Sequence, residues 1–273
     1  MSKNKQLEEL GPLFVKLVEI VARLRAPDGC PWDRKQTPQT LKKYVLEEAY
    51  EVVEAIEKDE PLEICEEIGD ALFLLIFLAY LYEEAGRFRI KDVLTLCAEK
   101  MIRRHPHVFG EQTLSSAEEV VAQWQKIKEE EAKKKGLSRS SVLGNLPRTL
   151  PALQRAFRVG ERASRVGFDW EKAEDLFDKL AEETSELKEA LKKGEPHKIE
   201  EEIGDLLFTV ANLSRKLSVN PEEALGKTVE KFIRRFTEME RRIQEKGGDL
   251  RETSLEEMDA VWEEIKREEE ASK

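Results

Sequence analysis

The sequence predicts an all-α protein, and three observations favour this fold class. Glycine and proline are scarce, at 14 and 10 of 273 residues, whereas the helix-favouring residues Glu, Lys, Leu and Ala are abundant. Apolar residues recur at helical spacing near the start of the chain. No segment alternates apolar and polar residues as a half-buried strand does. We therefore expect helices only, with the hydrophobic residues (40% of the chain) supplying their cores.

The expected helices form two sets of five in the same order. The first helix of the chain covers residues 6–25, and Gly11 with Pro12 either kinks it or marks its true start. The next three helices carry the motifs EExxE, EEIGD and EKxIRR, and the last carries a Trp with a Lys four residues later. These motifs lie at 47–51, 66–70, 99–104 and 124–128 in the first set, and at 182–186, 201–205, 230–235 and 262–266 in the second.

The two sets are copies of one domain. Residues 46–73 and 181–208 align without a gap at a constant offset of 135, and the motifs on either side follow in the same order. This pattern indicates a duplicated domain rather than a short-period solenoid. Turn-forming residues gather between the copies. We expect an N-terminal domain at 1–140, a linker at 141–152 and a C-terminal domain at 153–273.

Charge, cysteine content and hydropathy argue against several classes of protein. A net charge of −11 provides no basic field for a nucleic acid, so we expect no nucleic-acid partner. Three cysteines without CxxC spacing do not fit a disulfide framework or a zinc ribbon. The longest apolar run, residues 71–82, is shorter than the roughly 20 residues that span a bilayer, and it is typical of a buried helix. Because the chain also starts without an apolar leader, we expect a cytoplasmic protein with no membrane partner.

Acidic residues are predicted to converge in each copy. EExxE places two carboxylates three residues apart on one helix face, and EEIGD does the same on the next helix. A turn near Pro61 makes these two helices an antiparallel hairpin. Residues that face each other in such a hairpin have residue numbers with a constant sum. The sum is the same for 48 with 70 as for 51 with 67, and the same for 183 with 205 as for 186 with 202. Four carboxylates therefore meet in each copy, which are Glu48, Glu51, Glu67 and Asp70 in the first and Glu183, Glu186, Glu202 and Asp205 in the second.

A cluster of four carboxylates indicates a divalent cation, because the charges repel one another unless a metal neutralises them. Ligands that are all oxygen favour Mg²⁺, with Mn²⁺ also suitable, whereas a di-iron site would need the Glu-x-x-His motif, which the sequence lacks. The alternative is that the glutamates form a solvated charged face. Against it, EEIGD runs straight into apolar sequence in both copies. The carboxylates also match in both copies, although neighbours such as Ala49 and Thr184 differ.

The combination of EExxE and EExGDxLF, present twice, with HPHVF and EKxIRR, resembles the MazG family of nucleoside triphosphate pyrophosphohydrolases over nearly the whole chain. The resemblance implies two tandem all-α MazG-like domains whose four-helix-bundle cores are completed by dimerisation, and hence a homodimer. It also implies Mg²⁺-dependent hydrolysis of nucleoside triphosphates, ATP among them, between the α- and β-phosphates. The products would be a nucleoside monophosphate and pyrophosphate, and the role would be clearance of the nucleotide pool. The two sets of four carboxylates would then be the metal ligands.

Other residues have expected roles in this chemistry. Glu182 and Glu47, each next to a first ligand, would accept the proton of the attacking water. Lys231 and Arg235 share a helical face and would bind phosphate, with Arg234 as the alternative. Further substrate contacts would come from Trp262, Lys266 and the first-copy counterparts Lys100, Arg103, Arg104, Trp124 and Lys128. The competing interpretations are a solvated helix face for the basic residues and a core position for the tryptophan.

The two copies are not equivalent. Lys198 lies four residues before Glu202, where it would bind phosphate, whereas the first copy has Glu63, which would repel phosphate. Asn212 would read a base, and its counterpart is Phe77. We therefore expect the second copy to be the full nucleotide site, and a second active site in the first copy stays open because its four carboxylates are intact. The HPH segment of the first copy is interpreted as a structural turn.

Two other kinds of function remain open at this point. The same metal site would suit hydrolysis of inorganic pyrophosphate or of a deoxyuridine nucleotide. A different class is a non-catalytic helical regulatory module that binds metal for stability. The products of an incubation with nucleoside triphosphate and Mg²⁺ distinguish these functions.

Overall fold

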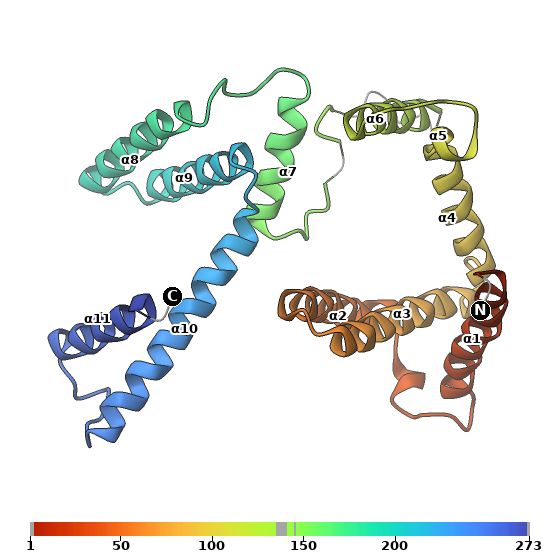
Figure 1. Ribbon diagram of the computed structural model, residues 1–273, viewed down its shortest axis with the longest axis horizontal. Coiled ribbons are helices and arrows are strands. Elements are labelled where there is room, and N and C mark those ends of the chain that lie inside the picture. Colours follow the sequence, from red (N-terminus) through yellow and green to blue (C-terminus); the bar gives the residue numbers. More distant parts are fainter. Residues whose placement is uncertain (1–2, 135–140, 145, 272–273) are drawn as a thin grey trace. The chain divides into compact units, whose positions relative to one another are not determined.

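The computed structural model describes residues 3–134, 141–144 and 146–271, and it confirms the all-α fold with tandem copies. All regular structure in these residues is helical (Figure 1). The chain divides into one compact unit at Met1–Glu131 and another at Ala132–Lys273. The domain bounds expected from the sequence stay a prediction, and part of the junction between the two domains lies outside the described residues.

The first unit contains the five helices expected of the first copy, together with two short ones. Its first helix runs through Gly11 and Pro12, so these residues do not mark its start. The HPH segment lies where one helix ends and the next short helix begins. The elements are α1 (Lys3–Arg25), η1 (Asp33–Lys35), α2 (Pro38–Lys58), α3 (Pro61–Glu84), α4 (Ile90–Arg104), α5 (Pro106–Phe109) and α6 (Ala117–Lys134), which continues past the end of the unit.

α2 and α3 form a hairpin with a short turn. α2 ends at Lys58 and is capped by Asp59, whose φ of 56° is left-handed, and Pro61 begins α3 at the helix position that favours proline. α3 carries the apolar run, which packs against α1 and α2 but is only partly buried, since Leu72 and Leu75 are exposed. The core residues are Val21, Leu41, Ile76, Phe77 and Leu81. No helix in the described part of the chain combines the length and the apolar character needed to cross a bilayer.

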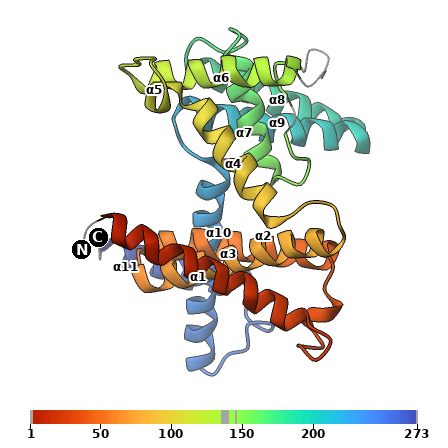
Figure 2. The same cartoon turned by 90° about the vertical axis from the view of Figure 1, so that its right-hand side faces the viewer.

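The second unit repeats the order of five helices. Its hairpin turns at Gly194, which has a φ of 66°, and Pro196 begins the second arm. α7 packs against α9 (Figures 1 and 2), and α11 folds back along α10 around a small core of its own (Figure 1). The elements are α7 (Ala152–Ser164), α8 (Asp175–Lys193), α9 (Pro196–Lys216), α10 (Pro221–Glu245) and α11 (Leu255–Ala271).

Both hairpins leave large apolar side chains in contact with solvent. Tyr50 of α2 and Leu72 of α3 are 60% and 41% exposed, and Phe177 of α8 and Leu207 of α9 are 57% and 50% exposed. Single exposed apolar residues are normal on a protein surface, but several on one hairpin are typical of a face that another protein covers.

Candidate active site

The α8–α9 hairpin brings together three of the four predicted carboxylates of the second unit. Glu183, Glu202 and Asp205 each place one oxygen within 4.8 Å of the others. Glu183 and Glu202 are buried, and Asp205 is exposed. Oε2 of Glu202 is buried and has no hydrogen-bond partner among the described residues, which is costly for a carboxylate unless a cation satisfies it. The donor set and this unsatisfied oxygen therefore fit a hard divalent cation.

The first unit holds the same arrangement in a more open form. Glu48, Glu67 and Asp70 also place oxygens within 4.8 Å of one another. Burial raises the pKa of Glu48, and the charges of Glu51 and Asp70 raise it further. Oε2 of Glu48 is buried without a hydrogen-bond partner in the described residues. This second cluster fits a cation as well, and the role of both clusters in metal binding stays a prediction.

The fourth predicted ligand of each unit lies beside its cluster. Glu51 and Glu186 are exposed, and neither belongs to the group of mutually close oxygens. The negative charge of Glu202 raises the pKa of Glu186, and the charge of Glu51 contributes to the raised pKa of Glu67, whose main cause is burial. Each fourth carboxylate thus interacts electrostatically with a member of its cluster, and its role as a metal ligand stays a prediction.

Two lysines contact the buried carboxylates of the second unit. Lys198 Nζ lies 2.8 Å from Glu202 Oε1, and Lys179 Nζ lies 2.7 Å from Glu183 Oε1. The Lys198 ammonium lowers the pKa of Glu202, and the hydrogen bond to Glu183 raises the pKa of Lys179. Sequence analysis identified Lys198 but missed Lys179. The signal was available, because each lysine stands four residues before its glutamate on the same helix face.

The two glutamates predicted to accept a proton lie outside the clusters. Glu182 is exposed, and its carboxylate pairs with Lys179 at 2.9 Å. Glu47 is also exposed, and its charge contributes to the raised pKa of Glu48. Both positions border a carboxylate cluster and are open to water, and their catalytic role stays a prediction.

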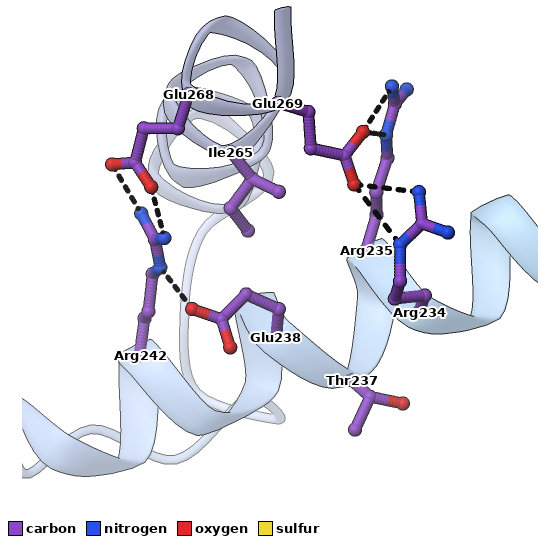
Figure 3. A pocket seen from close by; sticks show the side chains of 8 residues that line it. All are labelled: Arg234, Arg235, Thr237, Glu238, Arg242, Ile265, Glu268 and Glu269. Atoms are coloured by element: carbon purple, nitrogen blue, oxygen red, sulfur yellow. Dashed lines mark hydrogen bonds and ion pairs between the residues drawn. The ribbon is translucent and has the colours of Figure 1, made fainter. Parts of the chain in front are cut away.

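The arginine pairs predicted to bind phosphate are held by a glutamate in both units, an arrangement we call the arginine clasp. In the second unit Arg234 and Arg235 reach Glu269 at 2.9 and 2.7 Å, joining α10 to α11 (Figure 3). They line a pocket of about 770 Å³ between these helices. The first unit repeats the clasp between α4 and α6. Its members are Arg103, Arg104 and Glu131, with both ion pairs at 2.7 Å.

Sequence analysis missed the glutamate of each arginine clasp. Glu269 follows Trp262 by seven residues, and Glu131 follows Trp124 by seven, so the repeat contained the signal. Two guanidinium groups lower the pKa of Glu131 to about 2, with Arg104 the larger cause. The clasp is therefore a strong electrostatic contact.

The predicted aromatic and lysine contacts are divided between core and surface. Trp262 packs in the α10–α11 core and lies 5.2 Å from Phe232 between ring centres, in line with the core interpretation. Trp124 lies beneath Lys128, whose Nζ is 4.2 Å from the ring centre. Lys266 pairs with Glu263 at 2.6 Å, Lys231 is exposed and Lys100 is half-buried. The structure leaves a substrate role for all of them as a prediction.

Asn212 occupies the interior of the second unit. Its Nδ2 donates to the carbonyl of Phe208 at 3.0 Å, and its Oδ1 accepts from Arg215 Nε at 3.3 Å. Gly160 of α7 packs so closely that a Cβ there would lie 2.1 Å from Asn212 Oδ1. The amide is thus engaged between α7 and α9, and base reading by this residue stays a prediction.

Comparison with known proteins gives matches over both hairpins. A sequence profile described as the MazG nucleotide pyrophosphohydrolase domain matches residues 36–109 and 171–239. The chain is 46% identical over 260 residues to the nucleoside triphosphate pyrophosphohydrolase/pyrophosphatase MazG of Thermotoga maritima, covering 95% of this chain and 98% of that protein. It is 42% identical over 257 residues to the nucleoside triphosphate pyrophosphohydrolase of Escherichia coli K12, covering 93% of this chain and 97% of that protein.

A solved structure is also similar in part. The crystal structure of the mazG-related protein from Thermotoga maritima is 30% identical, covers 41% of this chain and 96% of that chain, and superposes with a TM-score of 0.37. The profile matches in both units and the two relatives aligned over nearly their whole length lead to one conclusion: the chain belongs to the MazG family of nucleotide pyrophosphohydrolases.

Proposed function

We propose that this chain hydrolyses nucleoside triphosphates between the α- and β-phosphates, releasing a nucleoside monophosphate and pyrophosphate, with Mg²⁺ as its metal. The observation that carries the proposal is the cluster of Glu183, Glu202 and Asp205, whose oxygens lie within 4.8 Å of one another beside Lys198. Such a site offers metal ligands and a phosphate-binding cation to one polyanionic substrate. The names of the relatives at 46% and 42% identity support the same activity.

The residues of the second unit have distinct roles in this proposal. Mg²⁺ or Mn²⁺, when bound, neutralises phosphate charge and positions water. The buried carboxylates hold that ion, while exposed Asp205 and Glu186 complete the cluster on the solvent side. Glu182 borders the cluster, is open to water and accepts the proton of the attacking water. Lys198 binds a phosphate oxygen, as do Lys231 and the clasp arginines of α10.

We also propose that the protein is a homodimer. A second copy laid against α8 and α9 would cover exposed side chains such as Phe177 and Leu207 and would complete a four-helix bundle. In the part of the chain that the structure describes, no hydrogen bond or ion pair joins the carboxylate cluster to α10 or α11. In this proposal the substrate, or a second copy of the chain, brings the carboxylate cluster and the basic residues of α10 to one site. Sedimentation velocity at several concentrations tests this assembly.

The enzymatic proposal is tested by identifying products. Each nucleoside triphosphate, ATP included, is incubated with the protein and Mg²⁺, and we expect a nucleoside monophosphate and pyrophosphate in equal amounts. A nucleoside diphosphate with orthophosphate would contradict the proposal. Cleavage confined to deoxyuridine nucleotides or inorganic pyrophosphate would favour the other hydrolases, and a metal that raises only the melting temperature would favour a regulatory module. We expect such an enzyme to act on the free nucleotide pool of the cytoplasm.

A further inference from the structure

The two units differ in the charge that surrounds their carboxylates. In the second unit Lys179 and Lys198 place their ammonium groups 2.7 and 2.8 Å from Glu183 and Glu202. The two glutamate side chains are only 6% and 1% exposed, so these ion pairs reach into buried positions. Buried charge is far less screened than charge on a surface. The lysines are therefore substantial counter-charges to the cluster.

The first unit has no lysine at the aligned positions, which hold Tyr44 and Glu63. The lysines nearest to these positions are engaged elsewhere. Lys43 lies over the Tyr44 ring, 4.4 Å from its centre, and Lys58 pairs with Glu63 at 2.7 Å. Within the described ranges no ion pair reaches the first cluster, whereas a buried oxygen without a hydrogen-bond partner is common to Glu48 and Glu202. The negative charge of this cluster is thus left for a free cation to neutralise.

A metal ion that enters the second cluster meets two ammonium groups already in place. A divalent cation at the same oxygens would lie within a few ångströms of both, and like charges at that distance repel strongly. The side chains of Lys179 and Lys198 are 34% and 47% exposed, so their flexible stems can carry the ammonium groups outward. A polyphosphate beside the cluster offers new anionic partners for them. Binding of the substrate therefore removes the charge repulsion that opposes metal binding.

We infer that Lys179 and Lys198 make metal binding in the second unit depend on a polyphosphate substrate, whereas the first unit binds the metal alone. The inference rests on the proposed function and adds an order of events to it. Free metal fills the first cluster whether or not nucleotide is present. Metal and nucleotide occupy the second cluster together, and the two lysines pass from carboxylate to phosphate as they do so.

Equilibrium dialysis of the full chain against Mn²⁺ tests this order by counting bound ions. Without nucleotide, Mn²⁺ should occupy only the first unit, so Glu48→Gln should abolish this binding and Glu202→Gln should leave it within a factor of two. Adding an ATP analogue with a methylene bridge between the α- and β-phosphates should restore Mn²⁺ binding to the Glu48→Gln protein. Binding restored in this way should be lost when Glu202→Gln is added.

The lysines themselves are tested in the Glu48→Gln background, where the first cluster is disabled. Replacing both Lys179 and Lys198 by Met should allow Mn²⁺ to bind without the analogue, at least tenfold more tightly than before. Lys193→Met is the matched control, because Lys193 pairs with Glu189 on the same helix but lies away from the cluster. The control should leave Mn²⁺ binding unchanged. If the double Met variant loses its helical circular dichroism signal, the test is repeated with Lys179 and Lys198 both replaced by Gln.

The outcomes separate the inference from the proposed function. Mn²⁺ binding without nucleotide that Glu202→Gln abolishes and Glu48→Gln spares would overturn the inference while leaving the hydrolase proposal intact. Equal Mn²⁺ affinity of the double Lys→Met variant and its parent would overturn it in the same way. No bound Mn²⁺ under any condition, together with no turnover, would remove both.

Discussion

The arginine clasp of the first unit makes a quantitative prediction about stability. Arg104 and Arg103 lie 2.7 Å from the Glu131 carboxylate and lower its pKa from 4.5 to about 2. A depression of this size corresponds to about 3 kcal/mol of preferential stabilisation of the ionised form. Because Arg103 is half exposed and solvent screens its charge, we expect Glu131→Gln to lower the free energy of unfolding by about 1–2 kcal/mol at pH 7.

The same contact has a defined pH dependence. The pKa of Glu131 is lower in the folded chain than in the unfolded one, so its contribution is complete above about pH 4.5 and is lost as the pH falls toward 2. Urea unfolding followed by far-ultraviolet circular dichroism measures the difference at pH 7 and pH 3, and the difference should shrink at pH 3. Glu130→Gln, at the exposed neighbouring residue of α6, is the matched control. Equal stability of the two variants at pH 7 would refute the reasoning.

Three further predictions concern packing, metal and assembly. Gly160→Ala should destabilise the second unit by about 1–3 kcal/mol in urea unfolding, because its Cβ would lie 2.1 Å from Asn212 Oδ1. Gly226→Ala, which adds a methyl group in open space on α10, should instead be neutral or stabilising. If Gly226→Ala were the more destabilising of the two, the packing argument would be contradicted. A chelator should abolish nucleotide hydrolysis and lower the melting temperature, with both restored by Mg²⁺, whereas turnover that survives the chelator would rule out the metal site. Leu207→Lys should convert the dimer to monomer in sedimentation velocity because it charges an exposed apolar face, and an unchanged dimer would place the interface elsewhere.

Much of the candidate site follows from local sequence patterns. A short turn between two helices sets their register, so the spacing of EExxE and EEIGD was enough to predict that Glu48 meets Asp70 and that Glu183 meets Asp205. The internal repeat strengthened this prediction because two copies showed the same arrangement. The left-handed residues that cap α2 and α8, Asp59 and Gly194, also follow from local backbone preferences.

The side-chain contacts that sequence analysis missed are ones for which the sequence offers several equally common partners. Lys–Glu pairs four residues apart are frequent in a chain with 38% charged residues, so the spacing of Lys179 and Glu183 was visible but did not distinguish this pair from the others. Base reading by Asn212 stays a prediction, but its contact with Arg215, whose guanidinium Asp169 holds at 2.5 Å, was not predicted. Contacts between residues 46 positions apart arise from tertiary packing, which helical periodicity alone does not specify.

The central claim is that the buried carboxylates of the second unit carry hydrolysis of a nucleoside triphosphate. The most direct test compares kcat and products for the wild-type protein, Glu183→Gln and Glu48→Gln with ATP and Mg²⁺. We expect AMP and pyrophosphate from the wild type, a loss of at least 100-fold in kcat for Glu183→Gln, and a much smaller loss for Glu48→Gln. Full activity of Glu183→Gln, or products other than AMP and pyrophosphate, would contradict the account.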